Sequence, residues 1–336
     1  MAGRPLLLIA NPTAGAKPGA PRTSSARREP ADLRDGLRQR GLEVDIHVLA
    51  EGDEVGQIAA AASADGRDVV VAGGDGTVRP AASALVETDA TLGAIPLGSW
   101  NNIARGWQLP TDLEAAMDVI AAGQTRNVDV GLAWHPARAA ALGSVTESDS
   151  PQDAIRFFEA AGVGLDAAGF GAAEVGVRHG LWRSLRSGWR AMRRRRTRML
   201  LIVDGKRLRT GAPAVTVCNG PYYGFGFALA PEADPADGQL DMVIFSGMST
   251  TDVVRHYLAV ARGRPRREPR VRHITTRRVE IAGLHRLLPV HADGESLGMT
   301  PIVFAVRPAG LRIFAEPPQL PGSPVAAAAS APNTRA

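Results

Sequence analysis

Residues 69–77 of this 336-residue chain read VVVAGGDGT, and this stretch decides the fold class. An apolar run from Val69 to Ala72 leads into a turn with three glycines and one aspartate. Such a run is typical of a strand buried in a parallel sheet. Because glycines lack Cβ, backbone N–H groups in the turn can approach an anion closely. The stretch therefore predicts a strand, a phosphate-binding turn and a helix; a plain tight turn is the alternative.

The alternation of strands and helices continues on both sides of this stretch. Predicted strands at residues 5–10, 42–49, 68–72 and 92–96 alternate with predicted helices at residues 31–40, 55–64, 77–86 and 113–122. This order indicates a parallel α/β sheet with helices on both faces. Two more polar turns, at residues 11–15 and 96–102, also follow strands. Because ligands of open α/β sheets bind at the carboxyl ends of strands, we expect all three turns to line one cleft.

The pattern changes near Asn127. Short strand-like runs separated by Gly, Pro and Asp turns follow, and they predict an antiparallel sandwich or barrel. These runs are residues 128–132, 156–161, 199–203, 214–219, 240–245, 278–282, 302–307 and 310–314. We therefore expect an α/β domain at residues 1–127, a β-rich domain at residues 128–303, and a disordered Pro/Ala/Ser-rich tail at residues 317–336. Residues 304–316 are able to pack back on the α/β domain.

Composition excludes several classes of protein. Hydrophobic residues make up 45% of the chain and charged residues 22%, which allows globular cores and excludes a wholly disordered chain. The single cysteine, Cys218, excludes an intrachain disulfide and a cysteine-based zinc site. No apolar run approaches the ~20 residues of a membrane-spanning helix. We therefore expect a cytoplasmic protein that binds the inner face of the membrane only peripherally.

Positive charge is concentrated in two segments. Residues 178–198, from Arg178 to Arg198, hold nine arginines and no acid, and residues 262–278, from Arg262 to Arg278, hold eight arginines and one acid. Concentrated positive charge attracts polyanions such as anionic lipid headgroups. No nucleic-acid module is visible, so no nucleic-acid partner is expected. A helix in the first segment would carry an apolar stripe, suited to a membrane interface or to the protein's own core, formed by Trp182, Leu185, Trp189 and Met192.

Ordered motifs resemble those of the diacylglycerol kinase catalytic-domain family, which includes sphingosine and ceramide kinases and bacterial lipid kinases. The first half carries N-P-x-A-G at residues 11–15, G-G-D-G-T at residues 73–77 and P-L-G-S-x-N-N-x-A-R at residues 96–105. The second half carries G-x-D-A at residues 164–167 and similar segments at residues 219–227, 231–241 and 291–295. The resemblance implies an NAD kinase-like fold, in which an α/β nucleotide-binding domain joins a β-rich sandwich domain at a cleft.

The resemblance also implies a lipid kinase that uses ATP and Mg²⁺ to phosphorylate a hydroxyl group of diacylglycerol or a related lipid. Asp293 would be the general base that takes the hydroxyl proton, and Glu295 would orient groups nearby or bind a second Mg²⁺. The carboxylates of Asp234 and Asp237 and the backbone carbonyl of Gln239 would hold a structural metal. The residues that would contact ATP are Asn11, Thr13, Gly73, Gly74, Asp75, Gly76, Thr77, Gly98, Ser99 and Asn101.

Two departures from the family pattern stand in the third turn, which usually reads G-T-x-N-D. Trp100 occupies x, where it could narrow the site or stack on a ring, and Asn102 replaces the aspartate, which removes a charge. Without the resemblance, Asp293-Gly294 and residues 234–238 would be ordinary turns with solvated acids. An NAD kinase-type enzyme and a non-catalytic lipid-binding protein on a kinase scaffold remain alternatives. Homodimerisation is left open.

Overall fold

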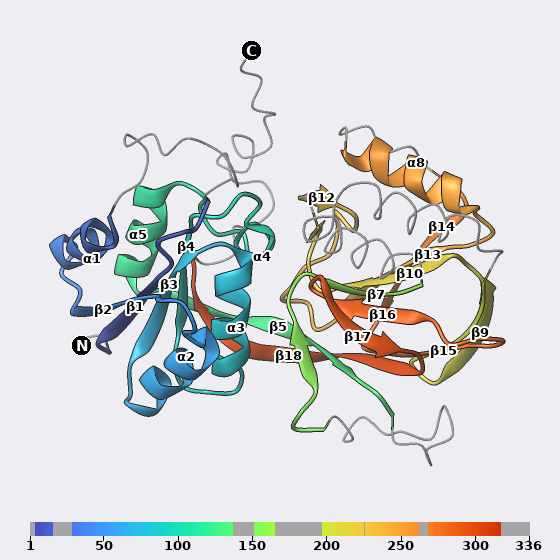
Figure 1. Ribbon diagram of the computed structural model, residues 1–336, viewed down its shortest axis with the longest axis horizontal. Coiled ribbons are helices and arrows are strands. Elements are labelled where there is room, and N and C mark those ends of the chain that lie inside the picture. Colours follow the sequence, from blue (N-terminus) through green and yellow to red (C-terminus); the bar gives the residue numbers. More distant parts are fainter. Residues whose placement is uncertain are drawn as a thin grey trace.

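The computed structural model describes residues 4–15, 29–136, 151–164, 197–224, 226–261 and 268–316. These residues form an α/β lobe and a β-rich lobe side by side, with strands β5 (Thr125–Trp134) and β18 (Ile302–Phe314) running between them (Figure 1). No helix in these ranges is long and apolar enough to cross a membrane. Several predicted features lie outside the described residues. They are the apolar stripe from Trp182 to Met192, Asp166 and Ala167 of the G-x-D-A motif, residues 178–196 and 262–267 of the two basic segments, and the tail at residues 317–336.

Four parallel strands form the centre of the α/β lobe. Their order is β2 (Val44–Val48), β1 (Leu6–Ala10), β3 (Asp68–Gly73) and β4 (Leu92–Pro96). Every residue of β3 is buried, because its side chains alternate between two covered faces. Val69 and Val71 pack with α2 (Val55–Ala64) and α3 (Asp75–Leu85), whereas Val70 and Ala72 pack with α1 (Pro30–Gln39) and α5 (Leu113–Ala122). The predicted parallel sheet with helices on both faces is confirmed.

The same sheet continues into the β-rich lobe through β18. This strand pairs parallel with β4 at Ile313, antiparallel with β5 between Val303 and Phe314, and antiparallel with β15 (Arg278–Gly283) at residues 302–305. Beyond β15 lie β8 (Arg198–Val203) and β9 (Lys206–Gly211), and β6 (Ile155–Phe157) pairs with β5. The predicted domain limits at residues 127 and 303 therefore fall inside strands that connect the lobes.

A second, antiparallel sheet completes the β-rich lobe. Its order is β14 (Val271–Thr276), β13 (Leu240–Phe245), β10 (Ala214–Cys218), β7 (Ala160–Gly164), β16 (Pro289–Ala292) and β17 (Glu295–Met299). Val163, Val217 and Phe304 belong to the core between the two sheets, so the lobe is a sandwich, as predicted. Helix α8 (Thr250–Ala261) covers the other face of the second sheet. A hairpin of β11 (Tyr222–Tyr223) and β12 (Phe227–Ala228) contacts α4 (Asn102–Gly106) and α8.

The structure differs from the sequence-based prediction in several strands. The predicted strand at residues 156–161 is two strands, β6 and β7, which belong to different sheets and separate at Phe158 and Glu159. The predicted strands at residues 302–307 and 310–314 are one strand, β18, with an irregular register between Arg307 and Leu311. The prediction misses β9, β14 and β17, because their largely exposed residues show no clear apolar alternation.

Candidate active site

The three glycine-bearing turns of the α/β lobe lie against one another. A Cβ atom added to Gly98 would lie 2.6 Å from the Cα atom of Gly74, and one added to Gly15 would lie 2.6 Å from the carbonyl oxygen of Leu97. These approaches are too close for any side chain, so only glycine permits the packing. The N–H of Leu97 also donates to the carbonyl of Gly73 at 2.9 Å. The predicted meeting of the three turns at one edge of the sheet is confirmed.

Two asparagines hold the shape of these turns. The Nδ2 atom of Asn11 donates to the Thr77 hydroxyl at 3.0 Å, and its Oδ1 atom accepts the Thr13 N–H at 2.9 Å. Asn101 has a left-handed backbone and exchanges hydrogen bonds with Gly98 in both directions, at 2.9 and 3.0 Å. These side chains therefore support the turns, and their predicted contacts with ATP stay predictions.

The second turn leaves room for an anion. Gly74 is the N-cap of α3, so the first N–H groups of this helix, at Asp75 and Gly76, have no acceptor within the helix. A Cβ atom added to Gly76 would meet no atom within 4 Å. The N-terminal end of a helix and open space in front of it suit a phosphate group. Thr77 is buried and its hydroxyl accepts a hydrogen bond from the Asn11 side chain, so it supports the turn, and its predicted contact with ATP stays a prediction.

Asp75 binds the backbone of the third turn. Its two carboxylate oxygens accept the N–H groups of Asn102 and Ile103, each at 3.0 Å. These groups begin α4, whose own N-cap residue, Asn101, makes no side-chain cap. A carboxylate at this position satisfies open N–H groups and interacts favourably with the helix dipole. Asp75 therefore caps α4 from the neighbouring turn, and a contact between its side chain and ATP stays a prediction.

We expect the Asp75→Ala variant to unfold at a lower temperature, because it leaves two N–H groups of α4 without their acceptor. Losing a cap costs about 1 to 2 kcal/mol, or several degrees in melting temperature. Thermal unfolding followed by circular dichroism measures this effect. Asp112→Ala is the matched control, since Asp112 caps α5 by accepting the Ala115 N–H at 3.0 Å. An Asp75→Ala protein as stable as wild type would contradict the capping role.

Asp293 lies in the β-rich lobe, in the turn between β16 and β17. Its Oδ2 atom accepts the N–H of Phe158 at 2.8 Å, and its Oδ1 atom accepts those of Glu159 at 2.9 Å and Ala160 at 3.1 Å. The chain offers these groups because β6 and β7 separate there. The side chain is therefore held rather than solvated, and Oδ2, with one hydrogen bond from the described residues, keeps a lone pair for another donor.

Burial raises the pKa of Asp293 to about 6. The N–H groups of Phe158 and Glu159 and the positive charge of Arg79 act in the opposite direction, because they stabilise the carboxylate. A general base is most effective when its pKa lies near the working pH. Asp293 is therefore ionised at neutral pH and basic enough to take a hydroxyl proton, which fits its predicted role.

Glu295 faces the α/β lobe. Its carboxylate forms an ion pair with Arg79, which lies on α3 two residues after the G-G-D-G-T turn. The pair joins the two lobes beside Asp293, whose pKa responds to the Arg79 charge. The sequence analysis did not identify Arg79, although its place in the helix that follows the G-G-D-G-T turn pointed to the site. An orienting role for Glu295 agrees with this contact, and binding of a metal stays a prediction.

Glu159 is an acidic residue of the site that sequence reasoning missed. Its Oε2 atom accepts the side-chain Nδ2 of Asn102 at 2.8 Å. Burial, together with the charges of Asp293 and Asp75, raises the pKa of Glu159 well above its usual value. The carboxyl groups of Asp75, Glu159 and Asp293 thus gather where the lobes meet. No signal pointed to Glu159, because it lies in an apolar run that reads as a continuous strand.

Trp100 lies at the edge of the site and is 49% exposed. A Cβ atom added to Gly226 would lie 2.9 Å from its ring, so the indole packs directly on the β11–β12 hairpin of the other lobe. Beside it, the Arg105 guanidinium lies over the Tyr222 ring, 3.9 Å from the centroid. The bulky residue of the third turn therefore contacts the opposite lobe, and whether it narrows the site or stacks on a ligand ring stays a prediction.

The predicted metal loop is folded around Asp129. The Oδ2 atom of this buried carboxylate accepts the N–H of Gly238 at 2.6 Å. Asp234 and Asp237 use their Oδ1 atoms to accept backbone N–H groups two residues further on, the second one that of Gln239. Carboxylate and carbonyl oxygens are the ligands that Mg²⁺ prefers, so the donor set fits this ion. Among the described residues, no three His, Cys, Asp or Glu side chains are placed so that they could hold a metal ion together, and the metal site stays a prediction.

The described ends of the two basic segments meet on the β-rich lobe. An open pocket of about 890 Å³ lies between β8, β9 and the start of β14. Three exposed arginines line it, one from each of these strands, together with small and hydroxyl-bearing residues: Arg198, Arg209, Arg272, Thr210, Gly211, Ser246 and Gly247. The pocket therefore gathers positive charge that is distant in the sequence.

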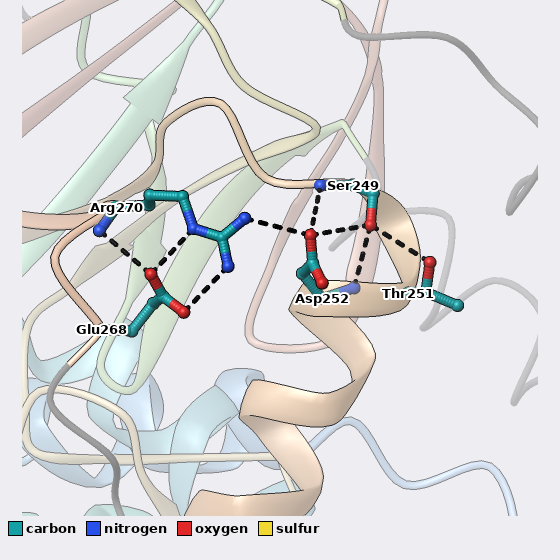
Figure 2. Close-up of polar contacts among 5 residues, drawn as sticks. All are labelled: Ser249, Thr251, Asp252, Glu268 and Arg270. Atoms are coloured by element: carbon teal, nitrogen blue, oxygen red, sulfur yellow. Dashed lines mark hydrogen bonds and ion pairs between the residues drawn. The ribbon is translucent and has the colours of Figure 1, made fainter.

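Another arginine of the second basic segment is neutralised. The Arg270 guanidinium donates to both carboxylate oxygens of Glu268, at 2.8 and 2.9 Å, and to Asp252 at 3.2 Å (Figure 2). Asp252 and Ser249 form a reciprocal capping box at the start of α8. The charge of Arg270 thus stabilises the junction between α8 and β14, and membrane binding by this segment stays a prediction.

These features define a class of protein: a two-lobed phosphotransferase, in which one lobe offers glycine turns and a helix N-terminus and the other a held carboxylate. Residues 5–133 match the diacylglycerol kinase catalytic domain, and residues 163–315 match the YegS C-terminal NAD kinase beta sandwich-like domain. The chain belongs to the diacylglycerol kinase catalytic-domain family and is a kinase. This assignment favours the lipid kinase branch over the two alternatives left open by the sequence.

Curated relatives carry matching names. A diacylglycerol kinase of Mycobacterium tuberculosis strain H37Rv is 29% identical over 285 residues, which is 83% of this chain and 86% of the relative. A probable lipid kinase YegS-like of Pseudomonas syringae is 28% identical over 309 residues, 87% of this chain and 92% of the relative. The crystal structure of a putative diacylglycerol kinase from Bacillus anthracis, at 20% identity, covers 94% of this chain and 99% of its own with a TM-score of 0.69, which supports the fold.

Proposed function

We propose that this kinase transfers the γ-phosphate of ATP to a hydroxyl group of diacylglycerol or a related lipid, in a Mg²⁺-dependent reaction. The observation that carries the proposal is the carboxylate of Asp293, which three N–H groups hold on one lobe while Arg79 and Glu295 join that lobe to α3. Phosphoryl transfer needs positioning and charge neutralisation rather than covalent catalysis, and these residues supply both. The names of the relatives support a lipid acceptor.

In the proposed reaction the lipid hydroxyl oxygen bonds to the γ-phosphorus of ATP. The bond from this phosphorus to the β–γ bridging oxygen breaks, and ADP leaves. Asp293 takes the hydroxyl proton through Oδ2, and the first N–H groups of α3 bind phosphate oxygens. Mg²⁺, when bound, neutralises phosphate charge.

Incubating the protein with labelled ATP, Mg²⁺ and a mixed lipid extract tests the proposal. We expect label in an organic-soluble product, whose identity names the acceptor, and no product when Mg²⁺ is chelated. In a parallel incubation with NAD in place of the lipids, transfer of label to NAD would favour an NAD kinase. Absence of any labelled lipid with well-folded protein would contradict the proposal.

We also propose that the protein docks on anionic membranes through its arginines. The pocket around Arg198, Arg209 and Arg272 supports this proposal, because three exposed guanidinium groups surround a space large enough for a headgroup. Each arginine near an anionic surface contributes about 1 kcal/mol to the free energy of membrane binding, and salt weakens this contribution by screening. A cytoplasmic location at the inner membrane face is part of the same proposal.

We expect the Arg209→Ala/Arg272→Ala variant to bind phosphatidylglycerol-containing vesicles about thirtyfold more weakly, since two arginines contribute about 2 kcal/mol. Co-sedimentation over a salt series, with phosphatidylcholine vesicles for comparison, measures this. Arg34→Ala/Arg67→Ala is the control: it removes the same charge from the α/β lobe, where both arginines are ion-paired. Equal binding by the two variants would remove the pocket from the docking proposal.

A further inference from the structure

The side chains of Asn102 and Glu159 connect the two lobes inside the site. Asn102 is 3% exposed, and its Nδ2 atom donates one hydrogen bond to Glu159 Oε2 at 2.8 Å and another to the carbonyl of Gly224 at 2.7 Å. Its Oδ1 atom is buried without a partner among the described residues. Turning the amide over would set Oδ1 against the Gly224 carbonyl, which has no hydrogen to donate, so the orientation of the amide is determined.

Both residues are also bound to the other acids of the site, through their backbones. The N–H of Asn102 donates to Asp75, and the N–H of Glu159 donates to Asp293 at 2.9 Å. A continuous chain of hydrogen bonds therefore leads from the G-G-D-G-T turn to the held carboxylate. Within this chain of hydrogen bonds, the contact between Asn102 and Glu159 is the step that crosses from one lobe to the other.

Electrostatics explains why an amide stands at position 102. Asp75, Glu159 and Asp293 already place three carboxyl groups here, and burial makes each further negative charge costly. A donor is needed opposite Glu159, and a carboxylate at position 102 would face both Glu159 and the Gly224 carbonyl. Asn102, which stands where the family usually has aspartate, therefore supplies the hydrogen-bond donor that Glu159 needs.

We propose that Glu159 is a positioning residue for phosphate transfer, and that its side chain, held by Asn102, sets the placement of Asp293 relative to the third glycine turn. This inference rests on the proposed kinase function. A shift of about 1 Å between reacting groups can cost about 10²-fold in rate, so a link of this kind affects turnover more than substrate binding.

The test compares wild type with Asn102→Asp and with the double variant Asn102→Asp/Glu159→Gln. The single variant sets two carboxylates against each other, whereas the double variant restores the hydrogen bond with the donor and acceptor exchanged. The backbone contact of residue 102 with Asp75 is retained in both, so the turn that precedes α4 keeps its cap. Glu280→Gln is the control, a buried glutamate on β15 whose charged partner is Arg278.

We expect Asn102→Asp to lower kcat by about 10²-fold, with KM for ATP within about threefold of wild type and the stoichiometry of ATP binding unchanged. The double variant should recover at least about tenfold of this loss, and Glu280→Gln should lower only the melting temperature. If Asn102→Asp does not fold, Asn102→Ser, which adds no charge, should show the same split between kcat and KM.

An unchanged kcat in Asn102→Asp, or in Asn102→Ser where Asn102→Asp does not fold, would overturn the inference while wild type stays active. A double variant no better than Asn102→Asp would also overturn it. Parallel losses of ATP-binding stoichiometry and activity would also overturn it, because they indicate a purely structural role. Wild-type protein without transfer activity would instead contradict the proposed function itself.

Discussion

Replacing Asp293 by asparagine should lower the rate of phosphate transfer by about 10²- to 10⁴-fold, the range that a general base contributes. The variant keeps the size of the side chain but cannot take the hydroxyl proton. The substitution also replaces one acceptor oxygen by an NH₂ group, which faces a backbone N–H of residues 158–160 and leaves it without an acceptor. Losing this hydrogen bond costs roughly 1 to 3 kcal/mol in stability. Turnover with the identified lipid measures the loss of rate, and thermal unfolding measures the loss of stability.

Asp204→Asn is the matched control for this experiment. Asp204 and Asp293 both precede glycine in hairpin turns, both have φ of 44°, and both accept backbone N–H groups. Asp204 lies between β8 and β9, away from the contacts of the site. We expect Asp204→Asn to lose stability and keep its turnover. A turnover near that of wild type in Asp293→Asn would refute the assignment of the base.

The pH dependence follows from the pKa of Asp293, which burial raises to about 6. Only the ionised carboxylate accepts a proton, so kcat/KM should fall about tenfold for each pH unit below this value and level off above it. The positive charge of Arg79 lowers this pKa. Arg79→Gln should therefore move the acidic limb to higher pH, and a limb at the same or a lower pH would contradict the proposed contact.

The second large effect is expected for Gly98→Ala. The added methyl group would lie 2.6 Å from the Cα atom of Gly74 and 2.7 Å from the Oδ1 atom of Asn101, so the second and third turns must move apart. Overpacking of this kind costs about 1 to 3 kcal/mol. ATP affinity should fall by at least about tenfold, because the N–H groups that we propose to bind phosphate move relative to Asp75 and the third turn. Calorimetry and thermal unfolding measure both quantities.

Gly76→Ala tests whether this effect is steric. Gly76 belongs to the same motif, but an added Cβ atom meets nothing within 4 Å. Alanine is also a better helix former than glycine, by about 0.5 to 1 kcal/mol, so the melting temperature should stay constant or rise. Equal destabilisation by Gly76→Ala and Gly98→Ala would indicate that backbone freedom, and not close packing, explains the glycines.

Local patterns in the sequence were sufficient to predict the fold of the α/β lobe. The apolar run before Gly73, the spacing of apolar residues in residues 55–64 and 113–122, and the glycine-bearing turns identified the strands, helices and binding edge. Each signal depends on residues within one or two turns of backbone, where period and propensity act directly. The motif at residues 293–295 also pointed to Asp293 and Glu295, although only through resemblance.

The contacts that make the site work were decided by the tertiary structure. Asp293 and the N–H of Phe158 are 135 residues apart in the chain, and Asn102 and Glu159 are 57 apart. Their pairing depends on where β6 and β7 separate, a break hidden inside one apolar run. Hydrogen bonds of this kind, and the desolvation that raises the pKa of Asp293, arise only when distant segments close around a polar group, so no local pattern encodes them.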